Sequence, residues 1–536
     1  MMTNNIIDEL SWRKIIKDIS NSEKVLTAQK LQKAIYCGFD PTNDSLHLGN
    51  LIQILLLRRF ALFGFQSLAV IGGATAMIGD PSGKSQERNL LSQEQLKNNI
   101  KGISKQLSSL INQQEFSDLN PLDLIRDFKI LNNHDYQHLE MVFKSINPNA
   151  QYKDSLITIL KELPLPLQEL NLSEQELTEL YQGLNLNVNY LKQQAKLADL
   201  NFHQLLKYLN TWIAAWKEFC QLAWGQTKST KVKDIKILNN SDWLSNFKLF
   251  DFLRDVAKDF NINQMLSKEM VSKRLETGIS YTEFSYMVLQ GYDFYHLYTK
   301  ENCYLQSGGS DQWGNITAGL DLIHRKIGAE SQAAGLTINL LTKSNGEKFG
   351  KSEKGAIFLS EAKTSTYELY QFLFNQEDKD LEKLFASLTF FDQKQIAFIS
   401  QLHRKNPTLR IGQKVLAATI TIFVHQLPGY FKALKITNAL FNNEIHQLTT
   451  SEILSIFKDV PTIKQTSDET LIAILVNHKI CNSKRQVREL IHDQAIVVNG
   501  QKITDENLII SKKAAINQQI TLIKKGKRNY YLVFHQ

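Results

Sequence analysis

Two short loops carry side chains suited to holding phosphate. HLGN at 47–50 opens an apolar stretch with helical spacing, which puts His47 and Asn50 three residues apart at a helix N-terminus. Such a terminus offers free N–H groups and partial positive charge, so neutral hydrogen-bonding side chains there can hold a phosphate. KFGKS at 348–352 places Lys348 and Lys351 in a glycine-flanked loop that can close over a polyphosphate. Taken alone, the first loop also fits an ordinary helix cap and the second a solvated basic loop.

A third loop, GDPSGKS at 79–85, superficially resembles a nucleotide-binding P-loop. That motif needs four residues between its glycines, whereas Gly79 and Gly83 bracket three, so a P-loop is excluded. Lys84 and Arg88 lie four residues apart and can share one face directed at phosphates. Two solvated charges would give the same pattern.

A polar stripe runs along the segment FSYMVLQGYDF. Tyr286, Gln290 and Asp293 fall at i, i+4 and i+7, on one face of a helix. A phenol, an amide and a carboxylate on one face can grip a small zwitterion, and core helices seldom bury three such groups without partners. An exposed polar face is the alternative interpretation.

The elements that must position these residues alternate between strand and helix. AIYCGF at 34–39 reads as a buried strand, the helical stretch from 47 ends at Gly64, and LAVIGG at 68–73 reads as a second strand. This alternation predicts βαβ units and a parallel sheet, whose ligands bind beyond the carboxyl ends of the strands. Both glycine-rich turns that follow the two strands would lie at that edge.

The composition is that of a folded protein of three or four domains. The chain has 536 residues, of which 43% are hydrophobic and 22% charged, and a net charge of +8. Its four cysteines are far apart, with no CxxC pair, which favours a reducing compartment. Acidic residues interrupt the N-terminus where a signal peptide would be apolar, and no long apolar run occurs. These features predict a cytoplasmic protein without a membrane span.

Charge separates two parts of the chain. Residues 137–232 hold nine lysines, nine acidic residues and no arginine, which is a poor footprint for nucleic acid. The motif FKILNNHDY at 128–136 is nearly repeated as IKILNNSDW at 235–243, which we interpret as a trace of an insertion, with a chance match as the alternative. Residues 467–536 hold eleven Lys and Arg against six acidic residues, so this end is the candidate for binding a polyanion.

Taken together and in order, the motifs resemble those of a known family. HLGN after a strand, GGATAMIGDPSGKSQER, YMVLQGYDF, GGSDQWGN and KFGKS closely resemble the bacterial-type tyrosyl-tRNA synthetases, which are class I aminoacyl-tRNA synthetases. Residues 469–503 look like the small S4 RNA-binding fold at the C-terminus of that family. Asn50 stands where the family usually has His, a swap that keeps a hydrogen-bond donor, and the segment 116–234 has no role assigned by the resemblance.

The resemblance implies a function for most of these residues. Those expected to act on the phosphates in catalysis are Thr42, His47, Asn50, Lys84, Arg88, Lys348, Lys351 and Ser352. Those expected to bind tyrosine are Tyr36, Asp80, Tyr286, Gln290 and Asp293. Those expected to line ATP or the adenylate are Cys37, Gly38, Asp40, Gly49, Gly309, Asp311, Gln312 and Lys351. Residues expected to bind RNA are Lys484, Arg485 and Arg488.

The implied enzyme is a tyrosine–tRNA ligase that uses ATP with Mg²⁺, has no tightly bound metal or organic cofactor, and is a homodimer acting on tRNA(Tyr). The expected fold is α/β, with a Rossmann-like catalytic domain split between 1–115 and 235–358, and a mainly helical insertion at 116–234. An α-helical domain at 359–460 and an S4-like α+β domain at 467–536 would follow. A catalytically silent RNA-binding protein and a tryptophan-charging enzyme are the rival hypotheses.

Two deletions follow from this layout. Removing 137–232 is expected to leave adenylate formation largely intact, because the insertion should be peripheral. Truncation after Pro461 is expected to preserve pyrophosphate exchange and to weaken tRNA charging.

Overall fold

The protein is described by a computed structural model over residues 3–82, 91–111, 172–184, 186, 202–225, 235–275, 278–352, 355–458, 460–526 and 529–536. These residues form two compact units, and each is described by itself. The first unit comprises 1–364 and 372–424, and the second comprises 365–371 and 425–536. Over the described ranges, no helix is long and apolar enough to cross a membrane.

A six-stranded sheet forms the centre of the first unit, with the order β1-β6-β5-β2-β3-β4. Neighbouring strands run parallel except β1 and β6, which are antiparallel. The strands are β1 Ile16–Ile19, β2 Ala34–Phe39, β3 Gln66–Ile71, β4 Lys236–Asn239, β5 Cys303–Gly309 and β6 Ala334–Ile338. The predicted strands at 34–39 and 68–73 are β2 and β3, so the α/β class and the parallel pairing are confirmed.

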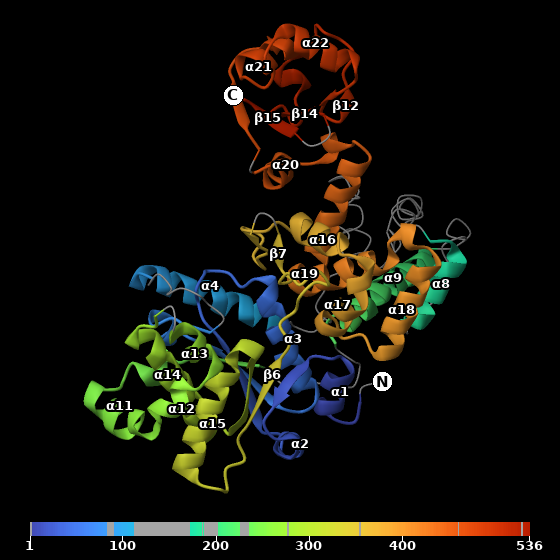
Figure 1. Cartoon of the computed structure of the whole chain (residues 1–536). Helices are drawn as coiled ribbons and strands as arrows, with labels where there is room; N and C mark the ends of the chain where they lie inside the picture. Colours follow the sequence, from blue (N-terminus) through green and yellow to red (C-terminus); the bar gives the residue numbers. More distant parts are fainter. Residues whose placement is uncertain are drawn as a thin grey trace. The chain divides into compact units, whose positions relative to one another are not determined.

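The first unit places helices around this sheet (Figure 1). Its helices before β5 are α1 Ile6–Trp12, α2 Ser22–Lys30, α3 Leu48–Leu62, α4 Gln93–Ile111, α8 Glu174–Gly183, α9 Phe202–Ala223, α10 Ser241–Leu244, α11 Leu249–Asp255, α12 Ile262–Leu266, α13 Glu269–Leu275 and α14 Tyr281–Lys300. Those after β5 are α15 Trp313–Ile327, α17 Leu381–Leu388 and α18 Gln393–Lys405. Two more, α16 Thr366–Phe374 and α19 Ile411–Phe441, run from one unit into the other.

Helix α3 follows β2 as the sequence predicts. It begins after His47 and ends before Gly64, whose φ of 91° belongs to the left-handed region that favours glycine. Nearly every side chain of α3 is buried, including the two arginines Arg58 and Arg59 at its C-terminal end. Burial lowers the pKa of Arg58 to about 10 and the pKa of Arg59 well below its usual value, because a buried guanidinium loses hydration.

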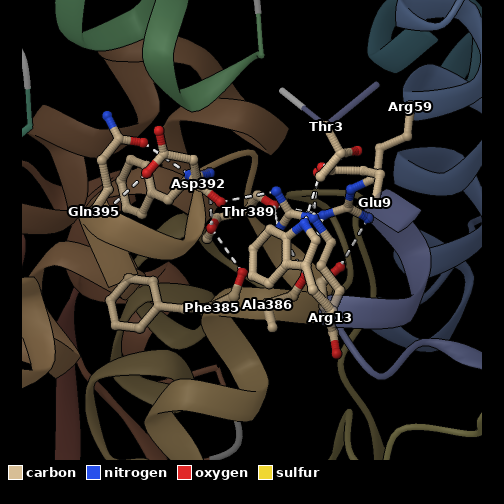
Figure 2. Close-up of polar contacts among 12 residues, drawn as sticks. Thr3, Glu9, Arg13, Arg59, Phe385, Ala386, Thr389, Asp392 and Gln395 are labelled. Carbon is tan, nitrogen blue, oxygen red and sulfur yellow. Dashed lines mark hydrogen bonds and ion pairs between the residues drawn. The ribbon is translucent and has the colours of Figure 1, made fainter. Parts of the chain in front are cut away.

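Arg59 and Arg13 together cap the C-terminal end of helix α17 (Figure 2). Arg59 donates to the carbonyls of Ala386 and Thr389, and Arg13 donates to the same two carbonyls from α1's C-terminal side. Glu9 accepts from Arg13 Nε at 2.7 Å, which partly balances the two cations. A helix C-terminus carries partial negative charge and unpaired carbonyls, so these guanidinium groups join three helices by one polar cluster.

Arg58 makes an equivalent contact with the region of the expected insertion. Its Nε donates to the carbonyl of Trp224 at 2.7 Å, and the indole N–H of Trp224 donates to the carbonyl of Ile422 at 3.4 Å. Trp216 and Phe219 of α9 are also buried. The described helices of this region therefore pack into the first unit, and the prediction that 137–232 is peripheral is wrong for α9. The first copy of the near-repeat, at 128–136, lies outside the described residues.

The second unit contains a five-stranded sheet with the order β12-β11-β14-β15-β9 and a two-stranded pair, β10 with β13. Its strands are β9 Thr462–Gln465, β10 Glu469–Thr470, β11 Ile496–Val498, β12 Gln501–Lys502, β13 Ile509–Ile510, β14 Ile520–Lys525 and β15 Asn529–His535. The helices that follow α19 are α20 Thr450–Ile456, α21 Leu471–Asn477 and α22 Lys484–His492. Asn499 and Gly500, both with positive φ, form the tight turn between β11 and β12, as in a hairpin.

The structure divides the segment 359–460 differently from the expected helical domain. Residues 372–424 belong to the first unit, whereas 425–460 belong to the second. Ile436, Ile453 and Phe457 form one hydrophobic cluster with Leu522 and Leu532 of the sheet. A cut after Pro461 would expose this cluster, so that truncation is not the clean separation expected from the sequence.

Candidate active site

A cavity of about 390 Å³ opens at the carboxyl ends of the central strands β2, β3 and β5. The predicted residues that line it are Tyr36, Cys37, Gly38, Asp40, Thr42, His47, Gly49, Asn50, Asp80, Tyr286, Gln290, Asp293, Gly309, Asp311, Gln312, Lys348 and Lys351. Parallel strands place the segments that follow them at one edge, which is why residues far apart in the sequence meet here. The cavity is thus built from every predicted motif of the catalytic part.

One part of the cavity is a buried polar pocket around Tyr36 and Asp293. The Tyr36 side chain on β2 is 2% exposed, and its hydroxyl has no hydrogen-bond partner among the described residues. Asp293 on α14 is also buried and accepts from Asn240 Nδ2 at 2.9 Å and Trp243 Nε1 at 2.7 Å. A buried hydroxyl without a partner is costly, so it indicates a place that a ligand completes.

Burial dominates the protonation of this pocket. It raises the pKa of Asp293 to about 7, while the hydrogen bonds from Asn240 and Trp243 act in the opposite direction and the Asp40 carboxylate adds to the rise. The pKa of Tyr36 also lies well above its usual value, because of burial and then the Asp293 carboxylate. At neutral pH Tyr36 is a neutral phenol beside a carboxyl group that is close to its midpoint.

A second polar group surrounds Asp40 at the end of β2. Tyr286 donates its hydroxyl to Asp40 Oδ2 at 2.8 Å, and Thr75 donates to Oδ1 at 3.1 Å. Burial, and then the nearby Asp40 and Asp80 carboxylates, raise the pKa of Tyr286 well above its usual value. Because the Tyr286 proton is directed to Asp40, the lone pairs of its oxygen remain as acceptors for a cation.

Asp80 lies in the loop after β3, beside Gln312. Its Oδ2 accepts from Gln312 Nε2 at 2.8 Å, and its Oδ1 accepts from the Ser82 backbone N–H at 2.9 Å. Together with Asp40 and Asp293, it gives the cavity three carboxyl groups. This concentration of negative charge favours a cationic group on the ligand.

The HLGN and KFGKS loops lie against each other. His47 is the N-cap of α3, and its backbone N–H donates to Asn50 Oδ1 at 3.1 Å. A Cβ on Gly49 would lie 2.9 Å from the His47 ring, and a Cβ on Gly350 would lie 3.2 Å from Leu48 Cβ. The glycines therefore allow the ring and the second loop to approach the helix N-terminus. Both readings of His47 hold at once, because it caps the helix and lines the cavity.

Cys37 and Gly38 form the wall of the cavity at the end of β2. Burial raises the pKa of Cys37 to about 12, so the thiol is neutral and is not a nucleophile at physiological pH. A Cβ on Gly38 would meet nothing within 4 Å. The backbone of Gly38 is therefore open to close approach by a ligand.

Not every predicted residue lies in this cavity. Lys84, Arg88 and the side chain of Ser352 lie outside the described residues. The three predicted RNA-binding residues are exposed on α22 of the second unit, where Arg485 pairs with Glu489 at 2.9 Å and Arg488 with Glu506 at 3.0 Å. These two ion pairs reduce the positive potential that the sequence alone suggests.

The sequence reasoning missed Asn240, Trp243, Thr75 and Asn315 as candidate site residues. Asn240 Nδ2 contacts both Asp293 and Thr75, so it links the two acidic groups of the cavity. Asn240 and Trp243 belong to the near-repeat ILNNSDW, which follows β4 at the same carboxyl edge of the sheet. Polar residues directly after a short apolar strand were the signal that could have identified them.

Comparison with known proteins agrees with the geometry. A family model described as tRNA synthetases class I (W and Y) matches residues 29–152 and 193–442, and one described as the Tyrosine--tRNA ligase SYY-like C-terminal domain matches 452–533. The first model passes over 153–192 only, which is shorter than the expected insertion at 116–234. The match on both sides places part of that segment within the family's own sequence.

Relatives along the whole chain carry one name. The tyrosine–tRNA ligase of Ureaplasma urealyticum serovar 10 is 40% identical over 530 residues, which are 99% of this chain and 98% of the relative. That of Listeria monocytogenes serovar 1/2a is 36% identical over 534 residues, with 99% and 100% covered.

Among solved structures, a C-terminally truncated mitochondrial tyrosyl-tRNA synthetase of Aspergillus nidulans has a TM-score of 0.53 and 21% identity, covering 82% of this chain and 94% of that one. This likeness shows a shared fold. On the family model and on relatives matched along their whole length, the chain belongs to the class I tRNA synthetases of the tryptophan and tyrosine family, in the group of the tyrosine–tRNA ligases.

Proposed function

We propose that this chain is a tyrosine–tRNA ligase, which activates tyrosine with ATP to tyrosyl-adenylate and then transfers the tyrosyl group to the terminal ribose of tRNA(Tyr). The observation that carries the choice of amino acid is the pocket of Tyr36 and Asp293. A buried phenol without a partner beside a buried carboxyl group fits a substrate that brings its own hydroxyl. A purely apolar side chain such as that of phenylalanine would leave both groups unpaired.

The substrate's phenolic hydroxyl would donate to Asp293 and accept from Tyr36. Its α-ammonium group would lie among Tyr286, Gln290 and Asp80, where the Tyr286 oxygen is an acceptor because its own proton is directed to Asp40. This placement sends the α-carboxylate toward Gly38 and the phosphate-binding loops. The ammonium would also relieve the repulsion among the cavity's carboxylates.

In the first step an oxygen of the tyrosine carboxylate attacks the α-phosphorus of ATP, and the bond to the β-phosphate oxygen breaks to release pyrophosphate. Negative charge grows on the departing pyrophosphate, so groups that meet it in the transition state accelerate the step. His47 and Thr42 would meet the γ-phosphate, and Lys348 and Lys351 the β- and γ-phosphates. Mg²⁺ would enter with ATP as part of the substrate.

No side chain of the cavity needs to become a nucleophile or a general base. The carboxylate of tyrosine is ionised at neutral pH, and the Cys37 thiol is neutral. Catalysis would therefore depend on positioning and on charge stabilisation at the phosphates.

Pyrophosphate exchange into ATP tests this function. We expect exchange that depends on tyrosine, with phenylalanine and tryptophan as poor substrates. Exchange only with tryptophan would assign the chain to the other branch of its family. Absence of exchange with any amino acid, in a protein that still binds RNA, would support a catalytically silent RNA-binding protein.

The transfer step requires RNA binding, for which we propose α22 of the second unit. Lys484 is exposed and makes no ion pair within the described residues, so it can contact a phosphate directly. Arg485 and Arg488 would first have to exchange their glutamate partners for phosphate.

We further propose a homodimer that acts in the cytoplasm, where tRNA is charged for translation. Exposed apolar side chains gather on α11 to α14, with Phe250 82%, Tyr281 76% and Leu249 68% exposed. A concentration of large apolar side chains on one face is typical of a protein–protein interface. Sedimentation of the wild type and of Phe250→Glu tests the proposal, because the variant should shift toward the monomer.

A further inference from the structure

A chain of amide hydrogen bonds lies beneath the amino-acid end of the cavity. Its centre is Asn315, in the first turn of α15, which is 0% exposed. Asn315 Nδ2 lies 2.9 Å from Gln290 Oε1, 3.2 Å from Gln312 Oε1 and 3.3 Å from Ser82 Oγ. One nitrogen thus contacts α14, the turn before α15 and the loop after β3.

The direction of these hydrogen bonds follows from the carboxylate at one end. Asp80 only accepts when ionised, so the group of Gln312 that faces it at 2.8 Å must be the Nε2 donor. The carbonyl oxygen of Gln312 then faces Asn315, which must present its own donor. The same nitrogen donates to Gln290 Oε1. A donor–acceptor order therefore runs from Asp80 through Gln312 to Asn315.

We propose that Asn315 is a positioning residue that fixes the amide orientation of both Gln290 and Gln312. The inference rests on the proposed function, in which these two side chains line the tyrosine and the adenylate. The two ends of a glutamine amide are nearly equal in shape, so packing alone does not choose between donor and acceptor. A rotated Gln290 would direct an N–H donor at the substrate's ammonium group in place of its carbonyl oxygen.

The far end of Asn315 supports a polar role over a packing role. Its carbonyl oxygen Oδ1 is buried and has no hydrogen-bond partner among the described residues. A leucine of similar volume would avoid this unsatisfied acceptor, so packing alone does not account for an amide here. The amide nitrogen, in contrast, is surrounded by three oxygen acceptors.

Two substitutions separate positioning from structural support. Asn315→Leu keeps the volume and removes the donor, so we expect the KM for tyrosine in pyrophosphate exchange to rise about tenfold, the equivalent of one hydrogen bond of ~1.4 kcal/mol. The melting temperature should stay within a few degrees of the wild type. Gln395→Glu is the matched control, because it also removes a buried amide donor, 3.1 Å from the Leu184 carbonyl, but in a part of the chain remote from the cavity.

Asn315→Asp adds a pH readout that a structural role would not produce. When ionised, this carboxylate cannot donate to either glutamine and repels their oxygens and Asp80. When protonated, its O–H can donate to one of them. We therefore expect the ratio of variant to wild-type kcat/KM for tyrosine to rise as the pH falls.

The outcomes distinguish this inference from the proposed function. A wild-type enzyme without tyrosine-dependent exchange would overturn the proposed function. A wild-type enzyme with exchange, together with an Asn315→Leu KM within twofold of wild type or a pH-independent Asn315→Asp ratio, would overturn the role of Asn315. A loss in Asn315→Leu that merely follows a lowered melting temperature, as in Gln395→Glu, would also overturn it.

Discussion

Replacing Trp243 with phenylalanine perturbs the carboxyl group proposed to read the substrate's hydroxyl. The Trp243 indole donates to Asp293 Oδ1 at 2.7 Å and thereby opposes the effect of burial, which raises the Asp293 pKa to about 7. Without this donor, burial is less opposed and the pKa rises further. Phenylalanine retains an aromatic ring to stack on His296, whose ring centroid lies 4.6 Å from that of Trp243.

The size of the effect follows from the value near 7. The acid is half ionised at pH 7, so kcat/KM for tyrosine should fall about tenfold between pH 8 and pH 6 in the wild type, because only the carboxylate is a strong acceptor. A charged hydrogen bond of ~1.5 kcal/mol corresponds to about one pKa unit. In Trp243→Phe about a tenth of the acid would be ionised at pH 7, so activity there falls about fivefold and recovers near pH 9.

The assay is tyrosine-dependent pyrophosphate exchange between pH 6 and pH 9, repeated with phenylalanine. The ratio of kcat/KM for tyrosine to that for phenylalanine isolates the titration that acts through the hydroxyl, because other titrating groups affect both substrates. Asp293→Asn should give a flat ratio. A wild-type ratio that does not change with pH, or a midpoint that stays in place in Trp243→Phe, would refute the reasoning.

Four more outcomes are expected. Asp293→Asn should lower the preference for tyrosine over phenylalanine about a hundredfold, the equivalent of a ~3 kcal/mol charged hydrogen bond, and an unchanged preference would remove Asp293 from the hydroxyl pocket. His47→Ala or Lys351→Ala should lower kcat about a hundredfold and change the tyrosine KM little, because both groups act on charge that develops late; a change confined to KM would assign them to ground-state binding. Arg58→Met should lower the free energy of unfolding by ~2 kcal/mol in urea titration, because the buried Trp224 carbonyl loses its donor, and an unaltered midpoint would mean that another group satisfies that carbonyl. Charging of tRNA should weaken, with a salt dependence shallower by about one for each lost phosphate contact, while exchange stays as the folding control, when alanine replaces Lys484, Arg485 and Arg488.

Local patterns were sufficient to predict the centre of the fold. The strand at 34–39 and the one beginning near 68 are continuous apolar runs, because a parallel sheet covered by helices buries both faces of its strands. The helix after His47 is delimited by its cap and by Gly64, both of which are local signals. Since the carboxyl ends of parallel strands share one edge, the meeting of HLGN, the loop after β3 and GGSDQWGN followed from topology alone.

Tertiary contacts decided how the remaining parts pack. Helix α9 has neutral, arginine-free surroundings in sequence, and only the hydrogen bond from Arg58 and the burial of Trp216 reveal that it is part of the first unit. Likewise, the boundary near 424 separates segments of similar helical composition. Hydrophobic pattern identifies a face that must be covered, but it does not say which distant face covers it.

The sequence by itself determined which side chains could act on tyrosine and phosphate, because their types and spacing are local properties of each motif. Only the tertiary structure decided their charge and direction. The pKa of Asp293 depends on burial and on donors from Asn240 and Trp243, more than 50 residues before it in the chain. The direction of the Gln290 amide depends on Asn315 across a helix interface. Desolvation and hydrogen-bond direction arise from neighbours in space, so no pattern within a single segment specifies them.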